Sequence, residues 1–119
     1  MSTSAFVGTV MIDCNDIDTM VRFWSEALGL EEKARYPSYV WLSRLSEKGP
    51  ALAFQRVPEP RQGKNRIHLD ISAEDPEAFA AHVVELGGSK IEDHEVDGFR
   101  WSVLADPEGN VFCVSRSGH

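Results

Sequence analysis

The sequence has few of the features that mark specialised protein classes. Only 2 cysteines occur among its 119 residues, Cys14 and Cys113, which excludes a disulfide-rich scaffold and makes free thiols the default. Basic residues are outnumbered by acidic ones, 12 against 19, for a formal net charge of −7. Because nucleic-acid binding requires clustered Lys and Arg, this balance argues against a nucleic-acid partner.

Long apolar runs are missing as well. No wholly apolar stretch approaches the roughly 20 residues that a membrane-spanning helix needs, and residues 1–5 lack the basic and apolar regions of a signal peptide. We therefore expect a cytoplasmic protein without a membrane partner. Hydrophobic residues make up 42% of the chain and include 6 Phe and 3 Trp, which suffices for one domain core without metal or disulfide staples.

The most informative feature is an internal repeat. A β-prone run that ends at Asp16 is followed by a segment that stops at Gly29, and a second run that ends at Asp75 is followed by a segment that stops at Gly88. The two aspartates and the two glycines are each 59 positions apart (75 − 16 and 88 − 29). A fixed offset of about half the chain predicts two similar modules.

Each module is expected to contain one helix and four strands. Asp16 and Asp75 are suitable N-caps, and Gly29 can take the left-handed conformation that ends a helix. The helices carry apolar stripes at helical spacing, formed by Ile17, Met20, Val21, Trp24 and Leu28, and by Phe79, Val83 and Leu86. Three β-prone runs follow each helix, over residues 32–36, 39–45 and 51–57, and over 90–96, 99–105 and 111–115. The sequence thus predicts an α+β fold with two tandem βαβββ modules, residues 5–57 and 65–116, in one domain spanning 1–119.

A tandem unit of this kind resembles the vicinal oxygen chelate superfamily, which includes glyoxalase I, bleomycin-resistance proteins, fosfomycin-resistance enzymes and extradiol dioxygenases. The resemblance covers nearly the whole chain and is carried by residues 16–30, with their Phe-Trp pair and Leu-Gly ending, and by the Asp-Pro-Glu-Gly-Asn turn at 106–110. Residues 54–70 resemble a bacterial glyoxalase-like branch. The resemblance implies that each module forms a curved half-barrel, that the two build a cup, and that the chain forms a homodimer.

The family resemblance also implies four metal ligands, on the opening and closing strands of each module. Carried over by position, these seats fall at His68, Thr9 and Cys113 and near Ala53 or Gln55. Only His68 matches the usual donor, because the family has His or Gln at the Thr9 seat and Glu at the Cys113 seat. We therefore expect no cofactor. If a divalent metal does bind, the expected ligands are His68, Gln55 and Cys113.

Strand alternation predicts which side chains face the cup. In the strand expected to begin at Arg66, the apolar residues 67, 69 and 71 suit the helix-packed side, which leaves Arg66, His68 and Asp70 together on the other side. In a binding site, Asp70 would orient His68 and Arg66 would bind an anionic group. The plainer alternative is an exposed strand face or an ion network at a dimer interface.

Other candidate ligand-binding residues follow from the same alternation. Thr9 and Gln55 face the cup, and Trp41 and Trp101 offer planar apolar surfaces for a flat or cationic ligand. Cys113 is either a small buried hydrophobe or, if His68 activates it, a nucleophile. Trp24 is expected in the core because it lies on the helical stripe.

The leading hypothesis is a protein that binds a small organic molecule through the ligand-binding residues Thr9, Trp41, Gln55, Arg66, Asp70, Trp101 and Cys113. It would either sequester the ligand or act as a metal-free enzyme with His68 as catalytic acid or base. A metal-dependent lyase or isomerase of the glyoxalase type is the first alternative. A structural or partner-binding module, whose cup is filled by its own side chains, is the second.

Overall fold

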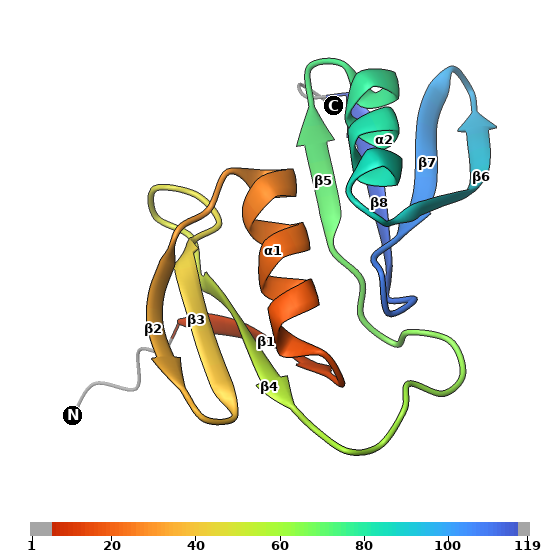
Figure 1. Cartoon of the computed structure of the whole chain (residues 1–119). Helices are drawn as coiled ribbons and strands as arrows, with labels where there is room; N and C mark the ends of the chain where they lie inside the picture. The colour runs from red at the N-terminus through yellow and green to blue at the C-terminus, as the bar shows by residue number, and fades with distance from the viewer. Residues whose placement is uncertain (1–5, 117–119) are drawn as a thin grey trace. The chain divides into compact units, whose positions relative to one another are not determined.

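The computed structural model of the chain describes residues 6–116 and contains two compact units, Met1–Pro60 and Arg61–His119. Each unit consists of one helix packed on a four-stranded sheet (Figure 1). The prediction of an α+β fold with two tandem βαβββ modules is therefore confirmed. The expectation about a signal peptide concerns residues 1–5, which lie outside the described residues. Within residues 6–116, neither helix is long and apolar enough to span a membrane.

The first unit begins with a strand and a well-capped helix. Its elements are β1 (Thr9–Cys14), α1 (Ile17–Leu28), β2 (Glu32–Tyr36), β3 (Tyr39–Arg44) and β4 (Ala51–Arg56). The sheet order is β1-β4-β3-β2, and only the β1–β4 pair is parallel. The Asp16 side chain accepts a hydrogen bond from the Thr19 amide at 3.1 Å, and Gly29 ends α1 at φ 67°. Both predicted helix boundaries therefore hold, for the predicted physical reasons.

The core of the first unit lies between α1 and one face of its sheet. Phe23 and Trp24 of α1 are buried with their rings edge to face, 5.2 Å between centroids. Trp24 is 1% exposed, so its predicted place in the core is confirmed. The sheet contributes the buried side chains of Val40, Leu42, Leu52 and Phe54.

The second unit repeats this architecture. Its elements are β5 (Asp70–Ala73), α2 (Pro76–Glu85), β6 (Ser89–Val96), β7 (Phe99–Ala105) and β8 (Val111–Arg116). The sheet order is β5-β8-β7-β6, and only the β5–β8 pair is parallel. Asp75 caps α2 by accepting a hydrogen bond from the Ala78 amide at 3.1 Å. Ala80 and Val83 of α2 are buried, as are Leu104, Phe112 and Val114 of the sheet.

The turn between β7 and β8 is organised by one buried carboxylate. Asp106 is 3% exposed, and its Oδ1 accepts hydrogen bonds from the Glu108 and Asn110 amides, both at 3.0 Å. Its Oδ2 accepts a third from Asn110 Nδ2 at 2.9 Å. These bonds explain the Asp and Asn of the sequence motif, because a buried carboxylate is stable only where hydrogen-bond donors surround it.

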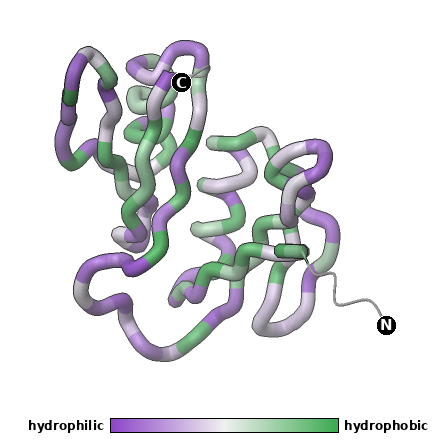
Figure 2. The backbone as a smooth tube through the Cα atoms, turned by 180° about the vertical axis from the view of Figure 1, so that it is seen from behind, coloured by the Kyte–Doolittle hydropathy of each residue, from purple (hydrophilic) through white to green (hydrophobic). Residues whose placement is uncertain are grey.

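The opening strand of the second unit is shorter than the sequence indicated. We expected a strand from Arg66 with Ile67 against the helix, but β5 begins at Asp70 and Ile67 is 82% exposed. In place of strand pairing, Asn65 Nδ2 donates to the carbonyls of Ile67 and Val111 at 3.3 and 3.2 Å. A side chain, and not strand pairing, thus links the chain at Asn65 to β8. Figure 2 shows that the segment between β4 and β5 is mostly hydrophilic.

Candidate functional site

The face of the second sheet opposite α2 carries most of the candidate residues of this unit. Phe112 and Val114 of β8 are buried on the α2 side, so Cys113 between them points to the other face, here called the open face. Cys113 pairs with Asp70 of β5, and Ser115 pairs with Trp101 of β7, which places all four on the open face.

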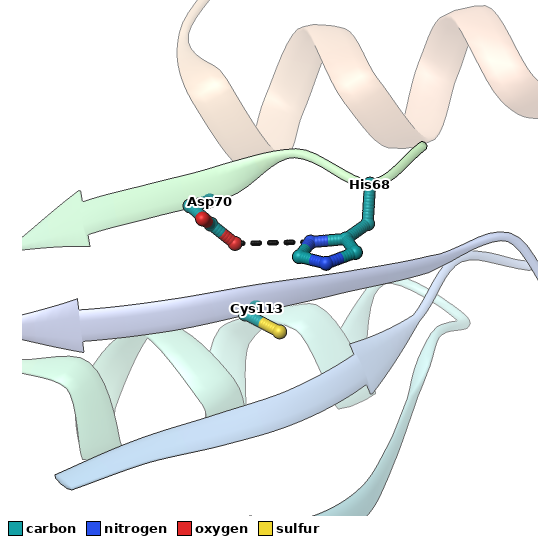
Figure 3. A group of neighbouring side chains, drawn as sticks. All are labelled: His68, Asp70 and Cys113. Atoms are coloured by element: carbon teal, nitrogen blue, oxygen red, sulfur yellow. Dashed lines mark hydrogen bonds and ion pairs between the residues drawn. The ribbon is translucent and has the colours of Figure 1, made fainter. Parts of the chain in front are cut away.

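His68, Asp70 and Cys113 form a cluster at the β5–β8 side of the open face (Figure 3). His68 Nδ1 and Asp70 Oδ1 are 3.1 Å apart, and one ligand atom from each of the three residues lies within 4.8 Å of the others. His68 and Asp70 are exposed, whereas Cys113 is half-buried. The expected pairing of Asp70 with His68 is therefore present.

The contact with Asp70 determines which nitrogen of His68 faces a ligand. A carboxylate only accepts hydrogen bonds, so Nδ1 carries the hydrogen in this contact and Nε2 of the neutral ring is an acceptor. The pair can therefore orient an imidazole whose free nitrogen takes a hydrogen bond or a proton from a ligand.

Cys113 lies in surroundings that keep its thiol protonated. Burial, and secondarily the negative charge of Asp70, raise the pKa of Cys113 above its ordinary value. A nucleophilic cysteine requires the opposite shift. The geometry and charge at this cluster thus favour the small-hydrophobe interpretation of Cys113 over a His68–Cys113 nucleophilic dyad.

An aromatic surface occupies the β6–β7 side of the same sheet. His94 and Trp101 are stacked at 5.0 Å between ring centroids and 15° between planes, and Phe99 lies 5.6 Å from Trp101. His94 Nε2 also pairs with Glu92 Oε2 at 3.4 Å. His94 is not among the site residues predicted from the sequence. The signal was available, because the Asp97-Gly98 turn sets the hairpin register that pairs position 94 with position 101.

Three further predicted residues lie together in the first unit. Trp41 Nε1 donates to Thr9 Oγ1 at 3.5 Å, and Gln55 Nε2 donates to the Tyr39 hydroxyl at 3.2 Å. Tyr39 and Trp41 are 5.9 Å apart at 31°, close to the geometry of Phe99 and Trp101 in the second unit. The repeat therefore extends to the aromatic pair on each sheet.

Arg66 is placed on the segment before β5 rather than on the strand. Its side chain is exposed and makes no hydrogen bond or ion pair with any residue in the range 6–116. Its guanidinium is therefore free to pair with an anionic group of a ligand.

The register of the two sheets identifies the residue of the first unit that corresponds to Cys113. Asp70 lies five positions before its helix cap and pairs with Cys113, and Met11 lies five positions before its own cap and pairs with Ala53. Ala53, not Gln55, is therefore the equivalent position. Gln55 instead pairs with Asp13.

The four-ligand metal site that the family resemblance implies does not fit these residues. Thr9 and Ala53 stand at the two positions of the first unit, where neither offers an imidazole or carboxylate. In the second unit, Asp70 accompanies His68 and Cys113 as the third possible donor.

Two tandem βαβββ units, with an open sheet face that carries polar and aromatic residues, define a fold of the glyoxalase and bleomycin-resistance type. The sequence comparison agrees, because residues 9–115 match the Glyoxalase-like domain family. The chain belongs to this family and, with it, to the vicinal oxygen chelate superfamily. No curated protein matches the sequence significantly.

Solved structures confirm the fold. A glyoxalase/bleomycin resistance protein/dioxygenase family enzyme from Burkholderia phytofirmans PsJN superposes with a TM-score of 0.78 at 22% identity, covering 94% of this chain and 98% of that one. A lactoylglutathione lyase from Agrobacterium tumefaciens gives 0.69 at 18% identity, covering 98% and 96%. A glyoxalase/bleomycin resistance protein from Albidiferax ferrireducens T118 gives 0.68 at 23% identity, covering 92% and 97%. At these low sequence identities, the superpositions show that the fold is shared.

Proposed function

We propose that this protein binds a small organic molecule on the open face of the second sheet, with His68 as its hydrogen-bonding and proton-accepting partner. The observation that carries the proposal is the contact between His68 Nδ1 and Asp70 Oδ1 at 3.1 Å. It orients the ring and leaves Nε2 as the free acceptor. An imidazole held by a carboxylate is a common arrangement for a general base.

The surroundings of His68 suggest the chemistry of the ligand. Cys113 supplies a neutral thiol beside it, and the stacked rings of His94 and Trp101 supply a flat apolar surface on the same sheet face. A ligand with a conjugated ring and a hydroxyl or other donor group would contact both parts. The protein would retain such a ligand, or remove a proton from it where that proton is acidic enough for imidazole.

A screen of phenols and other hydroxylated aromatic compounds tests this proposal. Binding is followed by quenching of tryptophan fluorescence and by the shift in melting temperature. We expect His68→Ala to weaken binding of any hit about tenfold, since a hydrogen bond to a ring nitrogen is lost. His82→Ala is the matched control, because His82 is exposed on α2. Equal weakening in both variants, or no effect in either, would contradict a role for His68.

A metal-dependent lyase or isomerase is the second candidate, and the observation in its favour is the His68, Asp70 and Cys113 cluster. Three donors of these types are acceptable zinc ligands. The donor set lacks the two residues that the first unit would have to contribute, so we place this candidate second. The homodimer expected from the resemblance belongs to the same proposal, and light scattering on the purified protein tests it.

A further inference from the structure

A groove of about 960 Å³ lies in the second unit between α2 and the hairpin of β6 and β7. Figure 1 shows these elements beside one another. Ala80 and Val84 line it from the helix, and Arg100 and Ser102 line it from β7, with Val114 of β8 also contributing. His94 and Trp101 of the hairpin also line the groove, so it adjoins the aromatic part of the open face. Its helix wall, together with Arg100 and Ser102, lies on the α2 side of the sheet, opposite the face that carries His68.

The first unit shows why this groove exists. The hairpins of the two units correspond, because Tyr36 pairs with Tyr39 at one turn and Val96 pairs with Phe99 at the other. Counting from these turns, Arg100 and Ser102 take the places of two buried apolar residues of the first unit. These are Val40 and Leu42, which are 0% and 1% exposed. Two core positions of the first unit are thus polar in the second.

The helix also contributes less side-chain volume in the second unit than in the first. With the N-caps aligned, Trp24 of α1 corresponds to Val83 of α2, and Val21 corresponds to Ala80. The large ring that fills the first core is therefore replaced by a smaller side chain. A core that loses volume from both of its walls leaves a hollow unless the backbone collapses, and here the hollow is open.

Some charged side chains around the groove have ion-pair partners and others do not. Lys90 pairs with Asp93 at 2.7 Å, and Arg100 pairs with Glu95 at 3.4 Å. Arg116 also lines the groove, and its Nη1 donates to the backbone carbonyl of Glu74 at 3.3 Å. Glu74 and Glu77 line the groove as well, and their carboxylates make no hydrogen bond or ion pair within the described part of the chain.

The equivalent acid of the first unit is, by contrast, already neutralised. With the N-caps aligned, Asp18 corresponds to Glu77, and Asp18 is paired with Arg35 at 2.9 Å. The second unit has Glu95 at the hairpin position of Arg35, so Glu77 lacks the corresponding cation. The helix wall of the groove therefore carries an acidic side chain, Glu77, without a paired cation.

We infer that this groove binds a small organic cation. An ammonium group would pair with Glu77 or Glu74, and an apolar body would lie over Ala81 and Val84, which are exposed on α2. Apolar lining next to carboxylates suits an amine with a hydrocarbon part better than a bare metal ion, which prefers several oxygen donors. The net charge of −7 adds a general attraction for cations.

Titration with phenethylammonium, followed by amide chemical shifts, tests the inference. We expect saturable shifts at residues 74–84 and 98–102, and binding at least threefold weaker for the neutral analogue 2-phenylethanol. Glu77→Gln should weaken phenethylammonium binding by a similar factor. Glu26→Gln is the matched control, because Glu26 is an exposed acid on α1, and it should change nothing.

Filling the groove provides a second, independent variant. Ser102→Leu introduces the residue that the first unit has at Leu42, and we expect it to abolish the shifts by filling the groove. The substitution also removes the hydrogen bond from Ser102 Oγ to Asp93 Oδ1 at 2.6 Å, so Ser102→Ala is the control, and it should leave the shifts in place. Equal affinity for phenethylammonium and 2-phenylethanol would overturn the charge argument. Shifts confined to residues 68–72 and 111–115 would overturn the groove as the site.

Discussion

Arg35 on β2 bonds to Asp18 on α1 at 2.9 Å and holds the outer hairpin of the first unit against its helix. The same guanidinium bonds to both carboxylate oxygens of Glu32, each at 2.9 Å. One arginine thus links two acids from different elements, a bidentate geometry that arginine forms and lysine does not.

Replacing Arg35 by Gln should reduce stability only modestly, by at most about 1 kcal/mol, because all three side chains are exposed to solvent. The arginine lowers the pKa of Glu32, chiefly through its hydrogen bonds. A lowered carboxyl pKa contributes stability above the ordinary pKa of Glu, and this contribution is lost as the pH falls through the lowered value.

Urea denaturation of the native chain and of Arg35→Gln, measured from neutral pH down into the acid range, checks this. The two proteins should differ at neutral pH and converge in acid. A constant difference at all pH values would show that the arginine acts through packing of its hydrocarbon part instead.

Asp106 should be the more sensitive position, because its carboxylate is buried. Asp106→Ala leaves the amides of Glu108 and Asn110 without their acceptor, and we expect a loss of about 2 kcal/mol in the free energy of unfolding. Glu26→Ala, on an exposed part of α1, should change it by less than about 0.5 kcal/mol. Chemical denaturation measures both, and equal losses would refute the role given to the turn.

Cys113 should react slowly with iodoacetamide near pH 8, because burial and the charge of Asp70 raise its pKa. Asp70→Asn removes the charge, lowers that pKa and should increase the alkylation rate a few-fold. Mass spectrometry of the peptides separates Cys113 from the buried Cys14. Glu85→Gln removes a charge at the end of α2 and serves as control. A rate unaffected by Asp70→Asn would mean that burial alone sets the thiol's reactivity.

Metal content distinguishes the two candidate functions. Because Thr9 and Ala53 supply neither imidazole nor carboxylate, we expect protein purified without a nickel column to contain far less than one metal ion per chain. Addition of Mn²⁺, Ni²⁺, Zn²⁺ or Co²⁺ should leave the melting temperature unchanged. Near-stoichiometric metal that is lost in His68→Ala would instead establish the metal-dependent candidate.

The sequence alone determined the elements and their repetition, because the signals for them are local. Asp16 and Asp75 cap helices wherever the following residues can be helical, Gly29 ends one of them, and Asp106 forms its turn with its near neighbours. Such interactions span only a few residues, so pattern and spacing were sufficient. The match to residues 9–115 then confirmed the family.

The tertiary structure decided which residues became neighbours across the sheets. It paired Cys113 with Asp70, and it put Ala53, not Gln55, at the corresponding position of the first unit. It also left Ile67 exposed, outside the strand. It also decided that one helix–hairpin core is filled and the other is hollow. These outcomes depend on register and on summed side-chain volume, which are properties of several strands at once and have no local signature in the chain.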